Sequence, residues 1–170
     1  MRFLVLLSAL LLSGCWAGDG LYSKSDARQP IPAGTYRATD PDGKTRLENI
    51  ALLPDGMTRI GDTDGKGLYG FAPLDEQNRR FVAWYHEDSA DPDDRTQVYM
   101  LLERRSDDEF VLYAPQCDGD GAEIATRAGA RVEKGSVDTC VFATRASVET
   151  ALRQIRNSED AIRIVRFRGK

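Results

Sequence analysis

The sequence predicts a mainly β (α+β) protein: an antiparallel sheet, a small barrel or a sandwich of about nine short strands, with one C-terminal amphipathic helix packed on it. Three observations predict this fold class. From Gly34 onward, short apolar and aromatic runs follow one another at intervals of roughly 10–15 residues. Asp, Gly and Pro separate these runs. A single convincing helical pattern stands near the C-terminus.

The predicted strands are rich in β-branched and aromatic residues. Because turn residues rather than helical segments connect most of them, antiparallel pairing is favoured over βαβ units. Asp55-Gly56 in LPDGM is typical of a hairpin turn. In chain order the strands are GTYRA (34–38), TRLENIALL (45–53), MTRI (57–60), LYGFAP (68–73), RFVAWYH (80–86), TQVYMLLE (96–103), EFVLYA (109–114), VDTCVFAT (137–144) and AIRIVRF (161–167).

The predicted helix runs from about Arg145 to Arg156. Four apolar residues fall on one face at the spacing i, i+3, i+4 and i+7: Val148, Ala151, Leu152 and Ile155. Thr144 or Ser147 can cap its start, because a hydroxyl oxygen there accepts from free backbone N–H groups. A second, shorter helix is expected near residues 122–128, within a Gly- and Ala-rich loop.

At the N-terminus, the basic Arg2 and the apolar run Phe3–Leu12 follow Met1. As a helix, these 10 residues span about 15 Å. A hydrocarbon core of about 30 Å requires roughly twice that length. A basic start, a Leu-rich centre and small residues at the end are instead typical of a secretory signal peptide.

The end of this segment, Leu12-Ser13-Gly14-Cys15, resembles the lipobox of bacterial lipoproteins. The resemblance implies cleavage before Cys15, a diacylglycerol on its sulfur and an acyl chain on its new amino group. Trp16, standing where Asp would signal retention, implies sorting to the outer membrane. We therefore expect a membrane anchor through Cys15 and a protein on the periplasmic face. Ordinary secretion with an incidental cysteine is the alternative.

The domain organisation follows from this cleavage. Residues 1–14 are expected to be the lipoprotein signal peptide, and residues 33–170 a single periplasmic globular domain. Residues 15–32 are expected to be the lipidated N-terminus and a flexible tether, because Gly, Ser, Asp and Pro are frequent and no period is evident. The formal net charge of −4 offers no basic field, so nucleic acid is not an expected partner.

The oxidising periplasm implies that Cys117 and Cys140, which remain besides Cys15, form a disulfide. A redox or metal-binding role for this pair is the alternative. The chain contains no Cys-x-x-Cys motif and only one His. Four acidic turns recur (40–45, 62–67, 91–96 and 118–123) and fit ordinary tight turns, with adventitious or structural Ca²⁺ binding as the alternative. The sequence predicts no metal site and no cofactor.

Few residues indicate a functional site. His86 precedes Glu87 and Asp88 at the end of a predicted strand, which makes it a weak candidate for a general base. Aromatic residues of the central strands could stack on a glycan or bind a partner protein if they are exposed. The candidates for such binding are Trp84, Tyr85 and Tyr99.

The absence of a recognisable catalytic motif favours a non-catalytic binding or assembly module with an envelope protein or glycan partner. An inhibitor of cell-wall hydrolases is a narrower version of this hypothesis, based on analogy of fold class. A hydrolase that uses His86 and nearby carboxylates is an alternative from another class.

Overall fold

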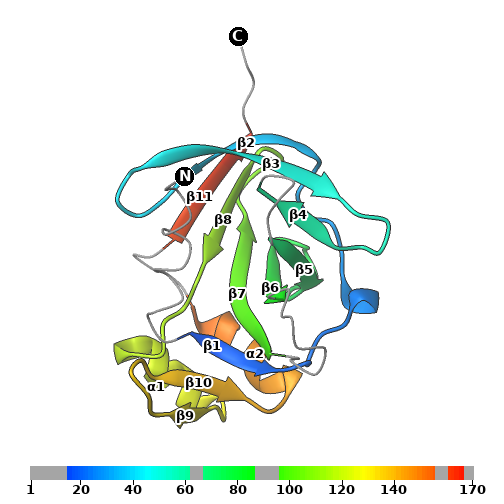
Figure 1. Ribbon diagram of the computed structural model, residues 1–170. Coiled ribbons are helices and arrows are strands. Elements are labelled where there is room, and N and C mark those ends of the chain that lie inside the picture. Colours follow the sequence, from blue (N-terminus) through cyan, green and yellow to red (C-terminus); the bar gives the residue numbers. More distant parts are fainter. Residues whose placement is uncertain (1–14, 62–66, 87–95, 156–160, 167–170) are drawn as a thin grey trace.

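The computed structural model describes residues 15–61, 67–86, 96–155 and 161–166. In these ranges the chain forms an 11-stranded sheet, two α-helices and one short 3-10 helix. Figure 1 shows a barrel of strands with a smaller group of strands and helices beneath it. No helix among the described residues has the length and apolar character needed to cross a bilayer. The sequence predicted about nine strands and one convincing helix, so it missed part of this second group.

Eight antiparallel strands close into the barrel, one of the architectures that the sequence allowed. They match eight predicted runs to within one residue at each end. The strands are β2 (Gly34–Thr39), β3 (Thr45–Leu52), β4 (Thr58–Ile60), β5 (Leu68–Pro73), β6 (Arg80–His86), β7 (Thr96–Arg104), β8 (Glu109–Tyr113) and β11 (Ala161–Arg166). Their order around the barrel is β6-β5-β4-β3-β2-β11-β8-β7, and β6–β7 pairing closes the ring. Closure leaves no unpaired barrel edge to attract another chain.

The other strands and both α-helices form an outer layer against one side of the barrel wall (Figure 1). β1 (Trp16–Asp19) pairs antiparallel with β7 and parallel with β10 (Thr139–Phe142). β9 (Arg131–Glu133) pairs antiparallel with β10. The helices are α1 (Gly119–Arg127) and α2 (Arg145–Gln154), and the 3-10 helix η2 is Lys24–Asp26.

Helix α2 has a defined start and end. The hydroxyl oxygen of Thr144 accepts a hydrogen bond from the backbone N–H of Ser147 at 3.2 Å. Ile155 adopts an extended conformation and ends the helix. The guanidinium of Arg80, on β6, donates to the carbonyl oxygens of Leu152 and Ile155 at 3.1 and 2.7 Å. A cation therefore satisfies the carbonyl end of the helix, where the dipole favours positive charge.

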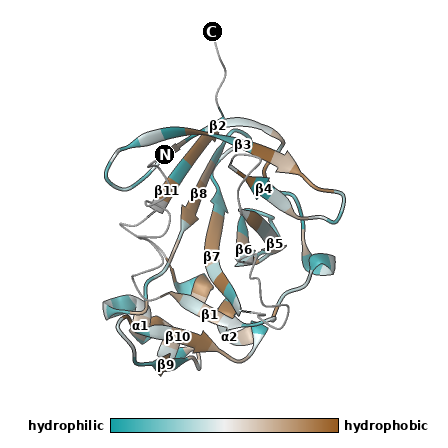
Figure 2. Cartoon of the chain, in the orientation of Figure 1, coloured by the Kyte–Doolittle hydropathy of each residue, from teal (hydrophilic) through white to brown (hydrophobic). Residues whose placement is uncertain are grey.

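The molecule has two hydrophobic cores because side chains of β5, β6 and β7 are buried on both faces. Along β6, Phe81 and Ala83 point into the barrel, while Val82 and Trp84 point towards the outer layer. In Figure 2, hydrophobic residues (brown) lie along much of β8, β10 and β11, and the turns between β2, β3 and β4 are mainly hydrophilic (teal). A strand that is buried on both faces has a nearly continuous apolar sequence, and RFVAWY in β6 is an example.

The N-terminal strap, residues 16–32, is folded onto the barrel and is not the flexible tether that the sequence predicted. Trp16 and Ile31 are completely buried, and Tyr22 is 4 % exposed. Gly, Ser, Asp and Pro are frequent in the strap, but its few large apolar side chains pack against partners that are far away in the sequence. Such non-local burial outweighs local composition because each large side chain removed from water stabilises by about 1.5–3 kcal/mol.

Cys117 and Cys140 form the predicted disulfide, with their Cα atoms 5.3 Å apart. Cys117 follows β8, and Cys140 lies in β10. The bridge therefore ties the outer layer to the end of a barrel strand. This covalent link closes a loop that contains α1 and β9, which favours the folded state by restricting the unfolded chain.

Candidate functional site

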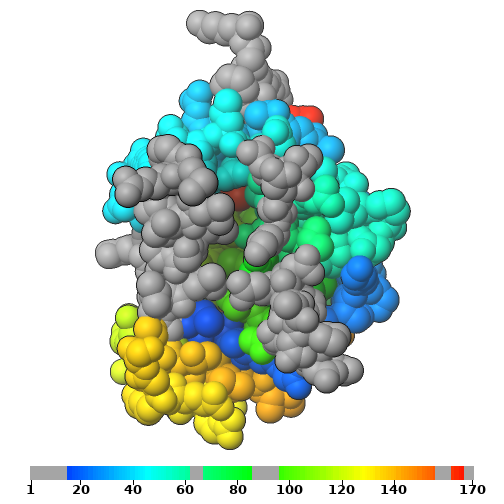
Figure 3. Space-filling model, viewed as in Figure 1, coloured from blue at the N-terminus to red at the C-terminus, as the bar shows by residue number. Residues whose placement is uncertain are grey.

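An apolar cavity of about 140 Å³ lies inside the barrel. We call it the barrel cavity. Figure 3 shows a hollow in this face of the molecule, with the green strands at its floor. Six of the side chains that line the cavity are Ile60, Tyr69, Met100, Leu112, Ile162 and Ile164. They come from β4, β5, β7, β8 and β11, so the cavity depends on closure of the whole barrel.

The cavity occupies only one end of the barrel. Its lining residues lie where β2, β4, β6 and β8 end and where their antiparallel partners begin. The opposite end is filled by buried side chains, among them Ile31, Phe81, Leu102 and Phe110. The barrel is therefore packed at one end and hollow at the other, which permits a rigid wall around an empty space.

A few polar groups border the cavity. Arg46 and Glu48 project from β3 and form an ion pair with each other. Burial raises the pKa of the Tyr69 hydroxyl to about 12, and Tyr85 beside it adds to this shift. The side-chain carbonyl oxygen of Gln116 is buried and has no hydrogen-bond partner among the residues that the structure describes. An unpaired buried acceptor is costly unless a ligand supplies a donor.

Cys15 lies in the wall of the same cavity. Burial raises the pKa of its thiol, which is half-buried. Its backbone forms a β-bridge with Gln116, and its carbonyl oxygen accepts from the N–H of Cys140 at 3.1 Å. Anything attached to this sulfur therefore begins at the barrel cavity and has no flexible spacer behind it.

The structure separates the three aromatic residues proposed for binding. Tyr85 is half-buried and lines the cavity. Tyr99 also lines it, but its ring packs outside the barrel against Tyr22 and Phe142. Trp84 is 1 % exposed and belongs to the core beneath the outer layer. The three residues therefore do not form an exposed aromatic surface.

His86 ends β6, where its backbone pairs with Leu68 and Gln97. Its side chain, and the neighbouring Glu87 and Asp88, lie outside the described residues. Whether they meet is therefore untested, and the hydrolase hypothesis stays a prediction. Among the residues that are described, no three His, Cys, Asp or Glu side chains are grouped closely enough to hold a metal ion.

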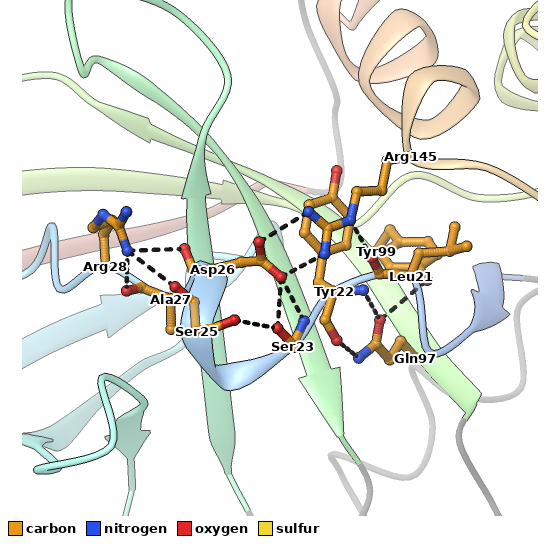
Figure 4. A network of polar contacts seen from close by, with 10 residues as sticks. All are labelled: Leu21, Tyr22, Ser23, Ser25, Asp26, Ala27, Arg28, Gln97, Tyr99 and Arg145. Carbon is orange, nitrogen blue, oxygen red and sulfur yellow. Dashed lines mark hydrogen bonds and ion pairs between the residues drawn. The ribbon is translucent and has the colours of Figure 1, made fainter.

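The N-terminal strap is fixed beside the cavity-bearing barrel by a polar network (Figure 4). Gln97 exchanges two hydrogen bonds with the backbone of Tyr22, at 3.0 and 2.6 Å. Arg145 of α2 lies 4.8 Å from the centre of the Tyr22 ring and donates to both carboxylate oxygens of Asp26. These bonds, with those from Ser23, hold the pKa of Asp26 at about 2.

The Tyr22 ring is in turn stacked on Trp84, with ring centres 5.0 Å apart. Trp84 lies across Gly70, its partner on β5. A Cβ atom at position 70 would stand 2.0 Å from the indole ring, so only glycine leaves room for it. Arg145, Tyr22, Trp84 and Gly70 thus form a continuous stack from α2 to the barrel wall.

Sequence reasoning did not find the lining residues of β2, β8 and β11. The available signal was the alternation within each strand. Tyr36 and Ala38 share one face of β2, Phe110 and Leu112 one face of β8, and Ile162 and Ile164 one face of β11. Period-2 alternation marks these residues as inward-facing, but not as the wall of an unfilled space.

No family model, no curated protein and no solved structure matches the chain.

Proposed function

We propose that this chain is a bacterial lipoprotein, anchored through Cys15 at the periplasmic face of the outer membrane, and that its barrel is a non-catalytic binding module for a small, mainly apolar ligand. The barrel cavity is the observation that carries the proposal. Its aliphatic and aromatic lining, with a few polar groups at Gln116, Arg46 and Glu48, is the usual composition of a ligand site. The lipobox at residues 12–15 supports the anchor.

The size of the cavity restricts the ligand. Its volume of about 140 Å³ is below the range for drug-sized ligands. It is close to that of an engineered apolar cavity of about 150 Å³ that binds benzene. About six carbon atoms therefore fit inside. At roughly 0.8 kcal/mol for each buried CH₂, these contribute about 5 kcal/mol, which corresponds to a Kd on the order of 0.1–1 mM.

The test uses the chain from position 15 onward with Cys15→Ser, exported behind an ordinary secretory leader so that it carries no lipid. The probe is parinaric acid, a fatty acid whose fluorescence increases in apolar surroundings. We expect saturable binding of one probe molecule. Ala38→Phe, which adds a ring at a buried position in the cavity wall, should weaken binding roughly tenfold or more.

The matched control is Ala51→Phe, because residue 51 is exposed on β3 and does not line the cavity. It should bind the probe like the parent. Urea unfolding of both variants identifies a variant that has lost its fold, and Leu112→Ala then supplies a second test. It enlarges the cavity and should strengthen binding. Absence of saturable binding by the parent, or binding indifferent to these cavity changes in folded variants, would overturn the proposal.

A further inference from the structure

The cavity and the predicted lipid attachment point coincide. Cys15 is both the lipobox cysteine and a residue of the cavity wall. We propose that one acyl chain of the lipid on Cys15 lies inside the barrel cavity, so that the protein carries its own apolar ligand. This inference rests on the proposed lipidation of Cys15. It names the ligand as an acyl chain and its source as the chain's own modification.

The first argument is the fixed position of Cys15. Its backbone is held by Gln116 and Cys140, and Trp16 beside it is completely buried. The sulfur therefore cannot move far from the cavity. A group tethered at this distance has a high effective concentration, on the order of millimolar or above for a short linker. A phospholipid of the membrane has no such advantage, because it must leave the bilayer completely to enter.

The second argument is chemical fit. The cavity takes about six carbon atoms of an apolar chain, and the rest of the chain can leave by the hollow end of the barrel. The modification therefore supplies an apolar chain of the kind that the aliphatic and aromatic lining accommodates.

Photo-crosslinking tests the inference on the full-length protein in its own membrane. Cells are fed a fatty acid with a photoreactive diazirine in its chain, the protein is purified after irradiation, and its peptides are mapped. We expect the chain on Cys15 to crosslink within the same molecule, to peptides that contain Met100, Leu112 or Ile164. Ala38→Phe should reduce these crosslinks roughly tenfold, whereas Ala51→Phe should leave them unchanged.

Each failure has its own signature. Label on Cys15 that crosslinks only to membrane lipids or detergent would overturn the inference and leave the anchor intact. No label on Cys15, or equal label on Cys15→Ser, would overturn the lipoprotein proposal itself. Internal crosslinks that Ala38→Phe leaves unchanged in a folded protein would place the chain outside the cavity and would also overturn the inference. Binding of parinaric acid by the unlipidated protein reports on the cavity independently of these outcomes.

Discussion

Replacement of Trp16 by alanine tests whether the N-terminal strap belongs to the folded domain. The indole is completely buried, lies 5.3 Å from the Phe142 ring and donates from Nε1 to the carbonyl oxygen of Gln116 at 3.2 Å. Truncating a buried Trp to Ala typically costs about 3–5 kcal/mol. Area burial gives a similar figure, since about 200 Å² at about 25 cal/mol/Å² is roughly 5 kcal/mol.

The assay is urea unfolding followed by far-UV circular dichroism, with the disulfide intact. With a slope of about 2 kcal/mol/M, the Trp16→Ala midpoint should fall by roughly 1.5–2.5 M. Leu47→Ala is the control, because Leu47 is 58 % exposed, and it should change the unfolding free energy by no more than about 0.5 kcal/mol. A Trp16→Ala effect as small as that of Leu47→Ala would refute the packed strap and restore the flexible tether.

Two further predictions concern the network that holds the strap. The pKa of Asp26 is about 2 in the folded protein, against an ordinary value of 3.8, so its contribution to the unfolding free energy should be complete above about pH 5 and should be lost as the pH falls towards 2. Asp26→Asn should remove this acid-dependent part, as measured by urea unfolding at several pH values; an unchanged pH profile would contradict the pairing with Arg145. Gly70→Ala should displace the Trp84 ring and cost about 1–3 kcal/mol, together with a change in near-UV circular dichroism; an unaltered aromatic signal would show that the stack is not as described.

The sequence predicted the barrel strands well because their signals are local. Alternating apolar residues and turn residues mark Gly34–Thr39 and Arg80–His86 without reference to the rest of the chain. β1 was missed for the opposite reason. Trp16–Asp19 contains Gly and Asp and has little strand propensity of its own. Its strand conformation depends on pairing with β7 and β10, which lie far away in the sequence.

The candidate site was less predictable than the fold. Trp84 and Tyr85 were both named as binding candidates, but neighbouring residues on a strand face opposite sides, and only Tyr85 of these two lines the cavity. The strand pattern of β6 does not indicate that an outer layer covers the face on which Trp84 lies. That layer comes from residues 16–32 and 115–155, which are distant in the sequence. The cavity is even harder to predict from local sequence patterns. It exists only where inward side chains from eight strands fail to meet.

The position of β1 directly after Cys15 determines how the molecule bears a mechanical load. A pull applied at Cys15 along the strand loads the β1–β7 and β1–β10 hydrogen bonds together, in shear, instead of opening them one after another. Beyond β10, the load passes through the Cys140–Cys117 bond into the end of β8. If Cys15 carries the proposed lipid anchor, traction from the membrane would reach the barrel wall through a strand and a covalent crosslink, and the domain would hold a fixed tilt where a tether would let it swing.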